Sequence, residues 1–222
     1  MALKFYFTKT TNATVPTNWH GTWNANGSAV NMKLLTAPET ATPTSVAPTE
    51  NQNSADYNVA MGRWISDALP VGTTFTNNST TWQSVIGVGE NNAAASHFDR
   101  FYIWIWTGSG VGDSSAANLS TDANSATEWT TTIAGRQMLN STAVAITTIG
   151  GAGTYTTVAG DRLVVEMGYH STSTDTVTYT GTMYYGGDGA DLDVNGDETT
   201  LSAWISFTGV PSVSPSVSPS AS

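Results

Sequence analysis

An acidic loop near the C-terminal end of the chain has the residue types and spacing of a calcium-binding loop. Residues 191–198 read Asp-Leu-Asp-Val-Asn-Gly-Asp-Glu, and oxygen-bearing side chains stand at alternate positions, namely Asp191, Asp193, Asn195 and Asp197. Alternate side chains of a tight loop converge on one point, and the glycine at the sixth position permits the turn. The twelfth position holds Ser202 in place of the expected bidentate glutamate. Two interpretations stay open, an acidic hairpin loop or a loop that calcium makes rigid, and calcium is the one cofactor indicated.

Two carboxylates, Asp161 and Glu166, lie on or beside one expected strand. Paired carboxylates at the right separation hydrolyse glycosidic bonds. Glu166 is equally well explained as a solvent-facing side chain or as a partner of Arg162 on the same strand face. The three histidines are scattered, and the chain has no Gly-x-Ser-x-Gly, His-Glu-x-x-His or phosphate-binding loop. We therefore expect no catalytic residues and no enzymatic activity.

The chain has eight tryptophans, which are too many for one small core unless some of them reach the surface. Flat aromatic side chains on a β-sandwich are a common means of gripping sugar rings. The candidates for a glycan site are Trp19, Trp23, Trp104 and Trp106. The alternative is that most tryptophans lie in the core or in a subunit interface, where this residue type is also favoured.

The strand expected to organise these side chains runs from Gly160 to Tyr169. Its residues alternate with period two, so that Leu163, Val165, Met167 and Tyr169 share one face. The segment from Phe101 to Trp106 is apolar on both alternating faces, so it either lies between two layers or shows an aromatic face to a partner.

About ten strands separated by turn signals are expected along the chain, which is typical of a β-sandwich or jelly roll. The other strands are expected at or within 4–8, 19–23, 29–35, 57–69, 73–75, 81–88, 143–149, 175–185 and 201–207. Residues 36–54, with three prolines, and residues 113–126 are expected to be surface loops. Residues 128–139 are expected to hold a short helical turn.

Charge and composition restrict the partners. Seven Lys and Arg stand against seventeen Asp and Glu, for a net charge of -10, and no basic stripe is visible, so nucleic acid is not an expected partner. No apolar run reaches the length of a membrane span, so no membrane association is expected. The chain has no cysteine, and its polar residues are mainly Thr, Ser and Asn. We expect a protein of a virion or of the extracellular space.

The chain divides at about residue 208. Residues 1–208 are expected to form one β-sandwich domain, and residues 209–222 a tail rich in Pro, Ser and Val. The tail contains the repeat Pro-Ser-Val-Ser, which cannot bury apolar surface and favours an extended spacer. The domain is therefore expected to be tethered to a neighbour, or the tail is the stub of a longer repeat.

Several segments together resemble uncharacterised structural proteins of tailed-phage and metagenomic viral sequences. They are Trp19-His-Gly-Thr-Trp23, Arg63-Trp-Ile-Ser-Asp-Ala-Leu-Pro70, Gly160-Asp-Arg-Leu-Val-Val-Glu-Met-Gly-Tyr169, Gly181-Thr-Met-Tyr-Tyr-Gly-Gly187 and Trp204-Ile-Ser-Phe207. The similarity spans most of residues 1–208, and it implies a β-sandwich virion protein. It brings no catalytic residues, and both the acidic loop and the terminal repeat lie outside it.

The sequence thus predicts an all-β, jelly-roll-like antiparallel β-sandwich. Its expected function is a non-enzymatic structural or display module of a phage particle or an extracellular fibre, which assembles with copies of itself or with other structural proteins through sheet faces. The alternative is a carbohydrate-binding module that grips a glycan with exposed tryptophans beside a calcium-ordered loop.

Overall fold

The computed structural model describes residues 2–49, 57–107, 115–131, 134–138, 144–193 and 200–211, except for the side chains of residues 122, 123 and 134–138. Within these residues lie fourteen strands and one 3₁₀ turn, Ala93–Ala95. The strands are β1 (Leu3–Thr11), β2 (Val30–Leu35), β3 (Ala41–Val46), β4 (Tyr57–Ala68), β5 (Thr74–Thr76), β6 (Thr81–Glu90), β7 (His97–Trp106), β8 (Ser115–Glu128), β9 (Ala134–Met138), β10 (Val144–Ala145), β11 (Thr154–Thr156), β12 (Arg162–Ser171), β13 (Gly181–Gly187) and β14 (Trp204–Thr208). The predicted all-β class is confirmed.

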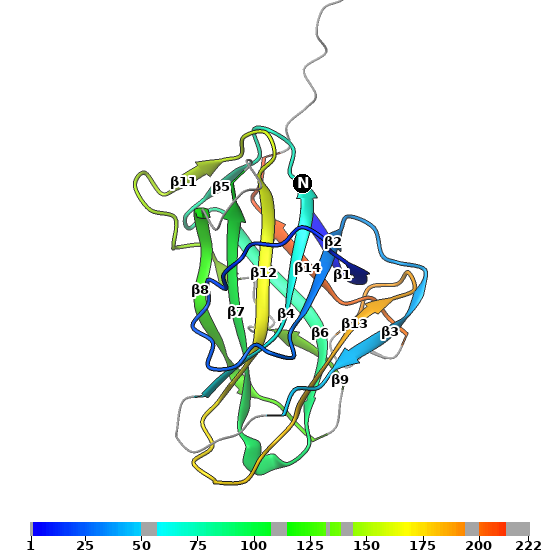
Figure 1. The fold of residues 1–222 in the computed structure, drawn as a ribbon. Helices are drawn as coiled ribbons and strands as arrows, with labels where there is room; N and C mark the ends of the chain where they lie inside the picture. The colour runs from blue at the N-terminus through cyan, green and yellow to red at the C-terminus, as the bar shows by residue number, and fades with distance from the viewer. Residues whose placement is uncertain are drawn as a thin grey trace, which may run out of the picture.

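Most strands belong to one sheet in the order β3-β13-β6-β14-β1-β2-β4-β12-β7-β8, with β9 and β10 also pairing with β6. Strands β5 and β11 form a separate ladder. The ladder between β2 and β4 is parallel, whereas the others described are antiparallel. Figure 1 shows β4, β12, β7 and β8 in a layer in front of β14 and β6. The long sheet therefore folds over near β2 into the predicted antiparallel β-sandwich, while its jelly-roll connectivity stays a prediction.

The core fills the space between the two layers. The predicted inner face of β12, made of Leu163, Val165, Met167 and Tyr169, is fully buried there. Aromatic rings join the layers, since Trp82 of β6 meets Phe101 of β7 edge-on with ring centroids 5.0 Å apart. Burying one such aliphatic or aromatic side chain contributes roughly 1.5–3 kcal/mol. Burial between layers is therefore what holds β12 and β7 at the centre of the domain.

The outer face of the same strands carries a second apolar cluster. It consists of Ile65, Tyr102, Trp104, Trp106 and Val164, with Val15 packed against it. The dark blue segment after β1 covers this cluster. It crosses in front of β12 and β7 before the chain returns to β2 (Figure 1). The strands in the middle of this layer are thus buried on both faces, which is the first of the two arrangements that the apolar pattern of residues 101–106 predicts.

Several expected elements are corrected by the structure. The loop expected at 36–54 contains β3, and the described part of the loop expected at 113–126, from residue 115 on, belongs to the long strand β8. The helical turn expected at 128–139 is wrong, because this stretch contains the end of β8 and all of β9. No strand forms at 19–23, and the strand expected at 143–149 is the two-residue β10 in the described part of the chain. The missed strands are poor in large apolar residues.

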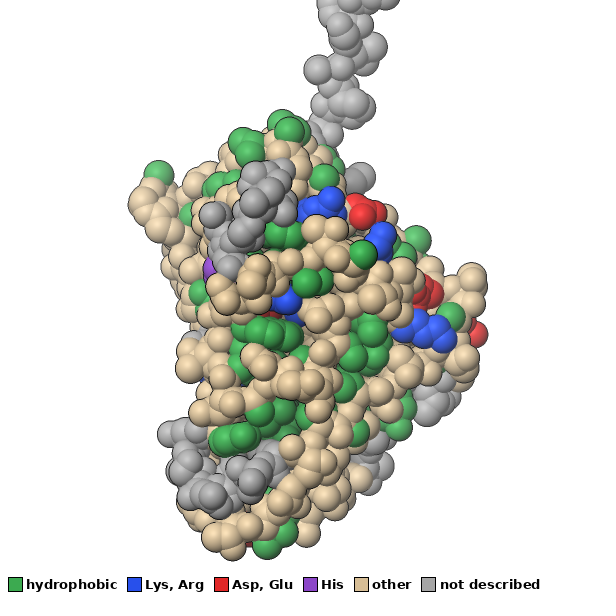
Figure 2. All heavy atoms as spheres, viewed as in Figure 1, with side chains coloured by type: hydrophobic (Ala, Val, Ile, Leu, Met, Phe, Trp, Pro, Cys, Tyr) green, Lys and Arg blue, Asp and Glu red, His purple; other side chains and the backbone are tan. Residues whose placement is uncertain are grey.

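The surface on the side of the covering segment is mostly uncharged. Figure 2, drawn from the same side as Figure 1, shows that charged side chains are few there and gather toward β2 and β3. Among the described residues, no helix has the length and apolar character that spanning a bilayer requires.

Gly168 permits the close approach of β12 to β4. A Cβ atom at this position would lie 1.9 Å from the backbone oxygen of Val59. The register shifts here, since Met167 pairs with Gly62 and Gly168 with Ala60, which leaves Met61 in a bulge. The two strands therefore tolerate no side chain at residue 168.

We predict that Gly168→Ala lowers the free energy of unfolding by about 2–4 kcal/mol, because the added methyl group overlaps backbone that cannot move freely. Urea denaturation measures the loss. Gly150→Ala is the matched control, since nothing lies within 4 Å of a Cβ there, and we expect a change within about 0.5 kcal/mol. Equal stability of the two variants would contradict the described register.

Candidate functional site

The segment from Asn12 to Ala25, here called the strap, lies across the outer face of β4, β12 and β7 (Figure 1). It connects β1 to β2, which are adjacent and antiparallel. Two such strands need only a short hairpin loop, and a connection as long as residues 12–29 is usual where a loop has a function of its own. The length of the strap therefore marks it as a candidate functional element.

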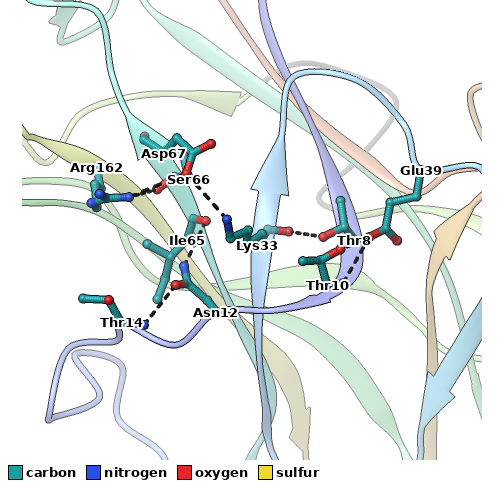
Figure 3. Close-up of polar contacts among 10 residues, drawn as sticks. All are labelled: Thr8, Thr10, Asn12, Thr14, Lys33, Glu39, Ile65, Ser66, Asp67 and Arg162. Carbon is teal, nitrogen blue, oxygen red and sulfur yellow. Dashed lines mark hydrogen bonds and ion pairs between the residues drawn. The ribbon is translucent and has the colours of Figure 1, made fainter.

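Both ends of the strap are fixed to β4. At the first end, Asn12 donates from Nδ2 to the backbone oxygen of Ile65 and accepts from the backbone amide of Thr14 (Figure 3). At the second end, the amides of Asn24 and Ala25 donate to the oxygen of Asn58, at 2.8 and 3.1 Å. The strap is thus pinned where it leaves and where it rejoins the sheet.

The surroundings of the first end are also held by polar contacts. Thr8 of β1 donates to the oxygen of Lys33 of β2 at 2.7 Å, and the Glu39 carboxylate accepts from the amide of Thr10 (Figure 3). The same carboxylate accepts from the amide of Lys9 at 2.8 Å. These bonds hold β1 to β2 and to the segment between β2 and β3. The strap therefore starts from a rigid base.

Glu166 of β12 holds the middle of the strap. Its carboxylate is fully buried and accepts from the amide of His20 at 2.9 Å, the amide of Gly21 at 2.8 Å and the indole Nε1 of Trp23 at 3.0 Å. Bonds to a charged acceptor are about twice as strong as bonds between neutral groups. A buried carboxylate without partners is costly, so Glu166 and the strap stabilise each other.

Cationic and aromatic side chains surround this carboxylate. Arg63 and Tyr102 are the cross-strand partners of Glu166 in β4 and β7, so the three side chains share the outer face. The guanidinium of Arg63 lies over the ring of Trp19, 4.7 Å from its centroid, and donates to the backbone oxygen of Asn18. Arg63 therefore adds a second attachment for the strap.

The imidazole of His20 stacks on the indole of Trp104. Their centroids are 3.8 Å apart and their planes differ by 20°. On the strap itself, Trp19 and Trp23 meet edge-on at 78° with centroids 6.4 Å apart. The fold thus brings together aromatic rings from residues far apart in the chain.

The four tryptophans singled out by the sequence lie at this face in two different settings. Trp104 and Trp106 are fully buried on the sheet, beneath the strap, whereas Trp19 and Trp23 of the strap are half-buried. The two half-buried rings are nearly perpendicular, so they do not form a flat platform. Stacking of a sugar on Trp104 requires the strap to move away.

Asp161 and Glu166 do not form a carboxylate pair. They are five residues apart along extended chain, about 16 Å, which exceeds the separation that glycoside hydrolysis uses. Asp161 accepts from the hydroxyl of Tyr155 in β11 and from the amide of Val158 in its own turn. Glu166 is neither exposed nor bonded to Arg162, which instead donates to the oxygen of Ser66 at 3.0 Å.

The acidic loop is described only in part. Asp191 bonds Lys4 of β1 through one oxygen and accepts from the hydroxyl of Tyr6 at 2.8 Å through the other. Asp193 is exposed, and Asn195 and Asp197 lie outside the described residues. In the described part of the chain, no three acidic or histidine side chains gather to hold a metal ion.

An apolar cleft of about 360 Å³ opens near the start of β1. Leu3 and Phe5 line it together with residues 35–38 and 67–70. Asp67 lies at the cleft and is largely exposed, 3.9 Å from the charged nitrogens of both Lys33 and Arg162. The cleft is apolar and carries no buried group able to do chemistry, so the strap-covered face is the better candidate site.

Comparison with protein-family models and with curated proteins gives no match for this chain.

We predict that Glu166→Gln destabilises the protein by about 2–4 kcal/mol, because an amide replaces one acceptor oxygen and the charge that strengthens three bonds is lost. Hydrogen exchange at the amides of His20 and Gly21 should accelerate. Urea denaturation and exchange mass spectrometry measure both effects. Glu128→Gln, at an exposed position of β8, is the control, and equal effects of the two changes would contradict the role of Glu166.

Tyr6 provides a pH-dependent test of its contact with Asp191. Burial, together with the hydrogen bond to Asp191 and its negative charge, raises the pKa of Tyr6 from 10.0 to about 12. The folded state thus favours the protonated phenol, so this contribution to stability is complete below pH 10 and is lost as the pH rises toward 12.

We expect Asp191→Asn to return the pKa of one tyrosine toward 10, and tyrosinate absorbance during alkaline titration measures it. Asp193→Asn, at an exposed position of the same loop, should leave the titration unchanged. A wild-type titration in which every tyrosine has its usual pKa would contradict the contact.

Proposed function

We propose that the protein is a non-enzymatic structural or display module of a phage particle or an extracellular fibre, and that it associates with copies of itself. The observation that carries this proposal is the long strand β8, Ser115–Glu128, at one end of the sheet. Among the described residues, β8 forms a ladder with β7 alone. An unpaired strand edge offers backbone donors and acceptors to a strand of another chain.

The two ends of the sheet differ in how well they resist such pairing. Strand β3 at the opposite end contains Pro43, which lacks a backbone donor and blunts a strand edge. Strand β8 contains no proline and no lysine, and its only charged residues are Asp122 and Glu128. Long edges without such protection favour association. We therefore assign the self-association to β8.

The chain's own contacts limit the part of β8 that a partner strand can reach. Thr148 donates to the backbone oxygen of Asn118 at 2.7 Å, so the first half of β8 is approached by the segment after β10. Thr121, Ala126 and Thr127 in the second half are exposed. We propose that the partner strand pairs along residues 120–128. A contact through the outer face of β4, β12 and β7 is disfavoured, because the strap covers it.

The proposal includes where the protein is found and how the domain is attached to a neighbour. A low-charge surface with Ser, Thr and Asn suits a virion or extracellular setting, and the repeat in residues 209–222 is suited to spacing the domain from a neighbour. A nucleic acid is not a proposed partner, because the net charge of -10 repels a polyanion.

Calcium binding by the acidic loop stays a proposal of its own. A calcium ion at Asp191 would compete with Lys4 and Tyr6 for the same carboxylate oxygens. Calorimetry with millimolar calcium tests the site, and no heat and no thermal shift would dispose of it.

We predict that Thr121→Lys with Ala126→Lys weakens self-association at least about tenfold, because two ammonium groups oppose strand addition at this edge. Light scattering over a concentration series measures it. Thr176→Lys with Thr178→Lys adds the same charge at exposed positions between β12 and β13 and should leave association unchanged. A wild-type chain that stays monomeric at high concentration would overturn the proposal.

A further inference from the structure

The imidazole ring of His20 stacks face to face on the indole ring of Trp104. The two rings are nearly parallel with centroids 3.8 Å apart, and Tyr102 is the next ring, 6.1 Å from the imidazole. A pyranose presents a flat apolar face of C–H groups, which stacks on an indole at a similar separation. His20 thus occupies a position that a sugar ring would fill.

The groups that Glu166 binds are neutral donors, namely two backbone amides and one indole N–H. Neighbouring hydroxyls of a sugar are neutral donors as well, and they can approach one carboxylate in pairs. If the strap leaves, Arg63 loses its acceptor at the oxygen of Asn18 and can donate to a ligand oxygen. The carboxylate and the guanidinium therefore match the donors and acceptors of a polyol.

Trp104 carries a polar group that the strap does not satisfy. Its Nε1 is buried and has no hydrogen-bond partner within the described part of the chain. An indole N–H lies in the plane of its ring, so the imidazole stacked on the face of Trp104 cannot accept from it. Unpaired buried donors are rare in native proteins. A ligand with peripheral oxygens can supply the missing acceptor.

The strap is attached in a way that permits its middle to leave while its ends stay. The ends are fixed to β4 at Asn12 and at Asn24, through Ile65 and Asn58 respectively. Hydrogen bonds from the middle to the sheet include those to the side chains of Glu166 and Arg63, and the guanidinium of Arg100 lies 5.9 Å from the ring centroid of Trp23. The side chains of Glu166 and Arg63 can exchange the strap for a ligand.

We infer that the sheet face beneath the strap is a binding site for a neutral oligosaccharide, and that the strap residues 19–23 occupy this site in the free protein. The sugar ring stacks on Trp104 in place of His20, and its hydroxyls bind Glu166 and Arg63. An anionic ligand is disfavoured, because Glu166 lies at the centre of the face. This function is additional to self-association through β8 and does not depend on it.

Occupation by the strap has a measurable consequence. If only a small fraction of molecules has the strap displaced, the apparent affinity is the intrinsic affinity multiplied by that fraction, so wild type should bind about 10- to 100-fold more weakly than a strap-free variant. The strap therefore sets the affinity without contributing to the bound state.

The test uses the full chain, a variant with residues 13–23 replaced by a short Gly-Ser linker, and His20→Ala. The probes are the hexasaccharides of β-1,4-linked glucose, β-1,4-linked N-acetylglucosamine, β-1,4-linked mannose and α-1,4-linked glucose. Calorimetry measures binding, and tryptophan fluorescence reports stacking. Near-UV circular dichroism establishes that each variant is folded. Thr17→Ala, at an exposed position of the strap, is the matched control for His20→Ala.

We expect at least one probe to bind the shortened variant about tenfold or more tighter than wild type, with a fluorescence change, and His20→Ala to gain part of that affinity. Thr17→Ala should behave as wild type. The inference is overturned if no probe binds the folded variants, or if wild type and the variants bind equally. If the shortened variant does not fold, His20→Ala against Thr17→Ala decides by the same criteria.

Discussion

The buried carboxylate of Glu166 is the interaction on which the arrangement around the central strands depends. It lies on the outer face of β12, fully buried among aromatic and cationic side chains. An ionised group in this setting is tolerated only with close partners. The strap supplies them from the N-terminal part of the sequence, and its His20 ring then covers Trp104. One side chain thus couples the sheet to a segment that is otherwise a long loop.

The middle strands of one layer are covered on both faces. The inner faces of β12 and β7 meet β6 and β14 across the core, and their outer faces meet the strap. The face drawn in Figure 2 carries few charged side chains. Contacts through this face therefore depend mainly on shape and on hydrogen bonds.

The parts of the fold that the sequence predicts are those in which burial follows a local rule. Leu163 to Tyr169 alternate with period two, so both the strand and its inner face were predictable. Strand β8 offers no such signal, because Ser, Thr, Asn and Ala are compatible with loops, and Pro43 concealed the edge strand β3. For the site, residues 101–106 indicated a covered aromatic face. What covers it was not predictable, because the partners of Glu166 are 143 to 146 positions away.

The position of β1 between β14 and β2 has a consequence for synthesis of the chain. Leu3 pairs with Phe207, so the first strand cannot complete its ladders until the last strand has left the ribosome. The strap must wait for Trp104 and then for Glu166, and meanwhile Trp19 and Trp23 have no sheet to lie on. Pairing of such distant segments is slow, and exposed aromatic residues attract chaperones and other nascent chains. The ladder between β1 and β14 and the contacts of the strap with Trp104 and Glu166 therefore form late.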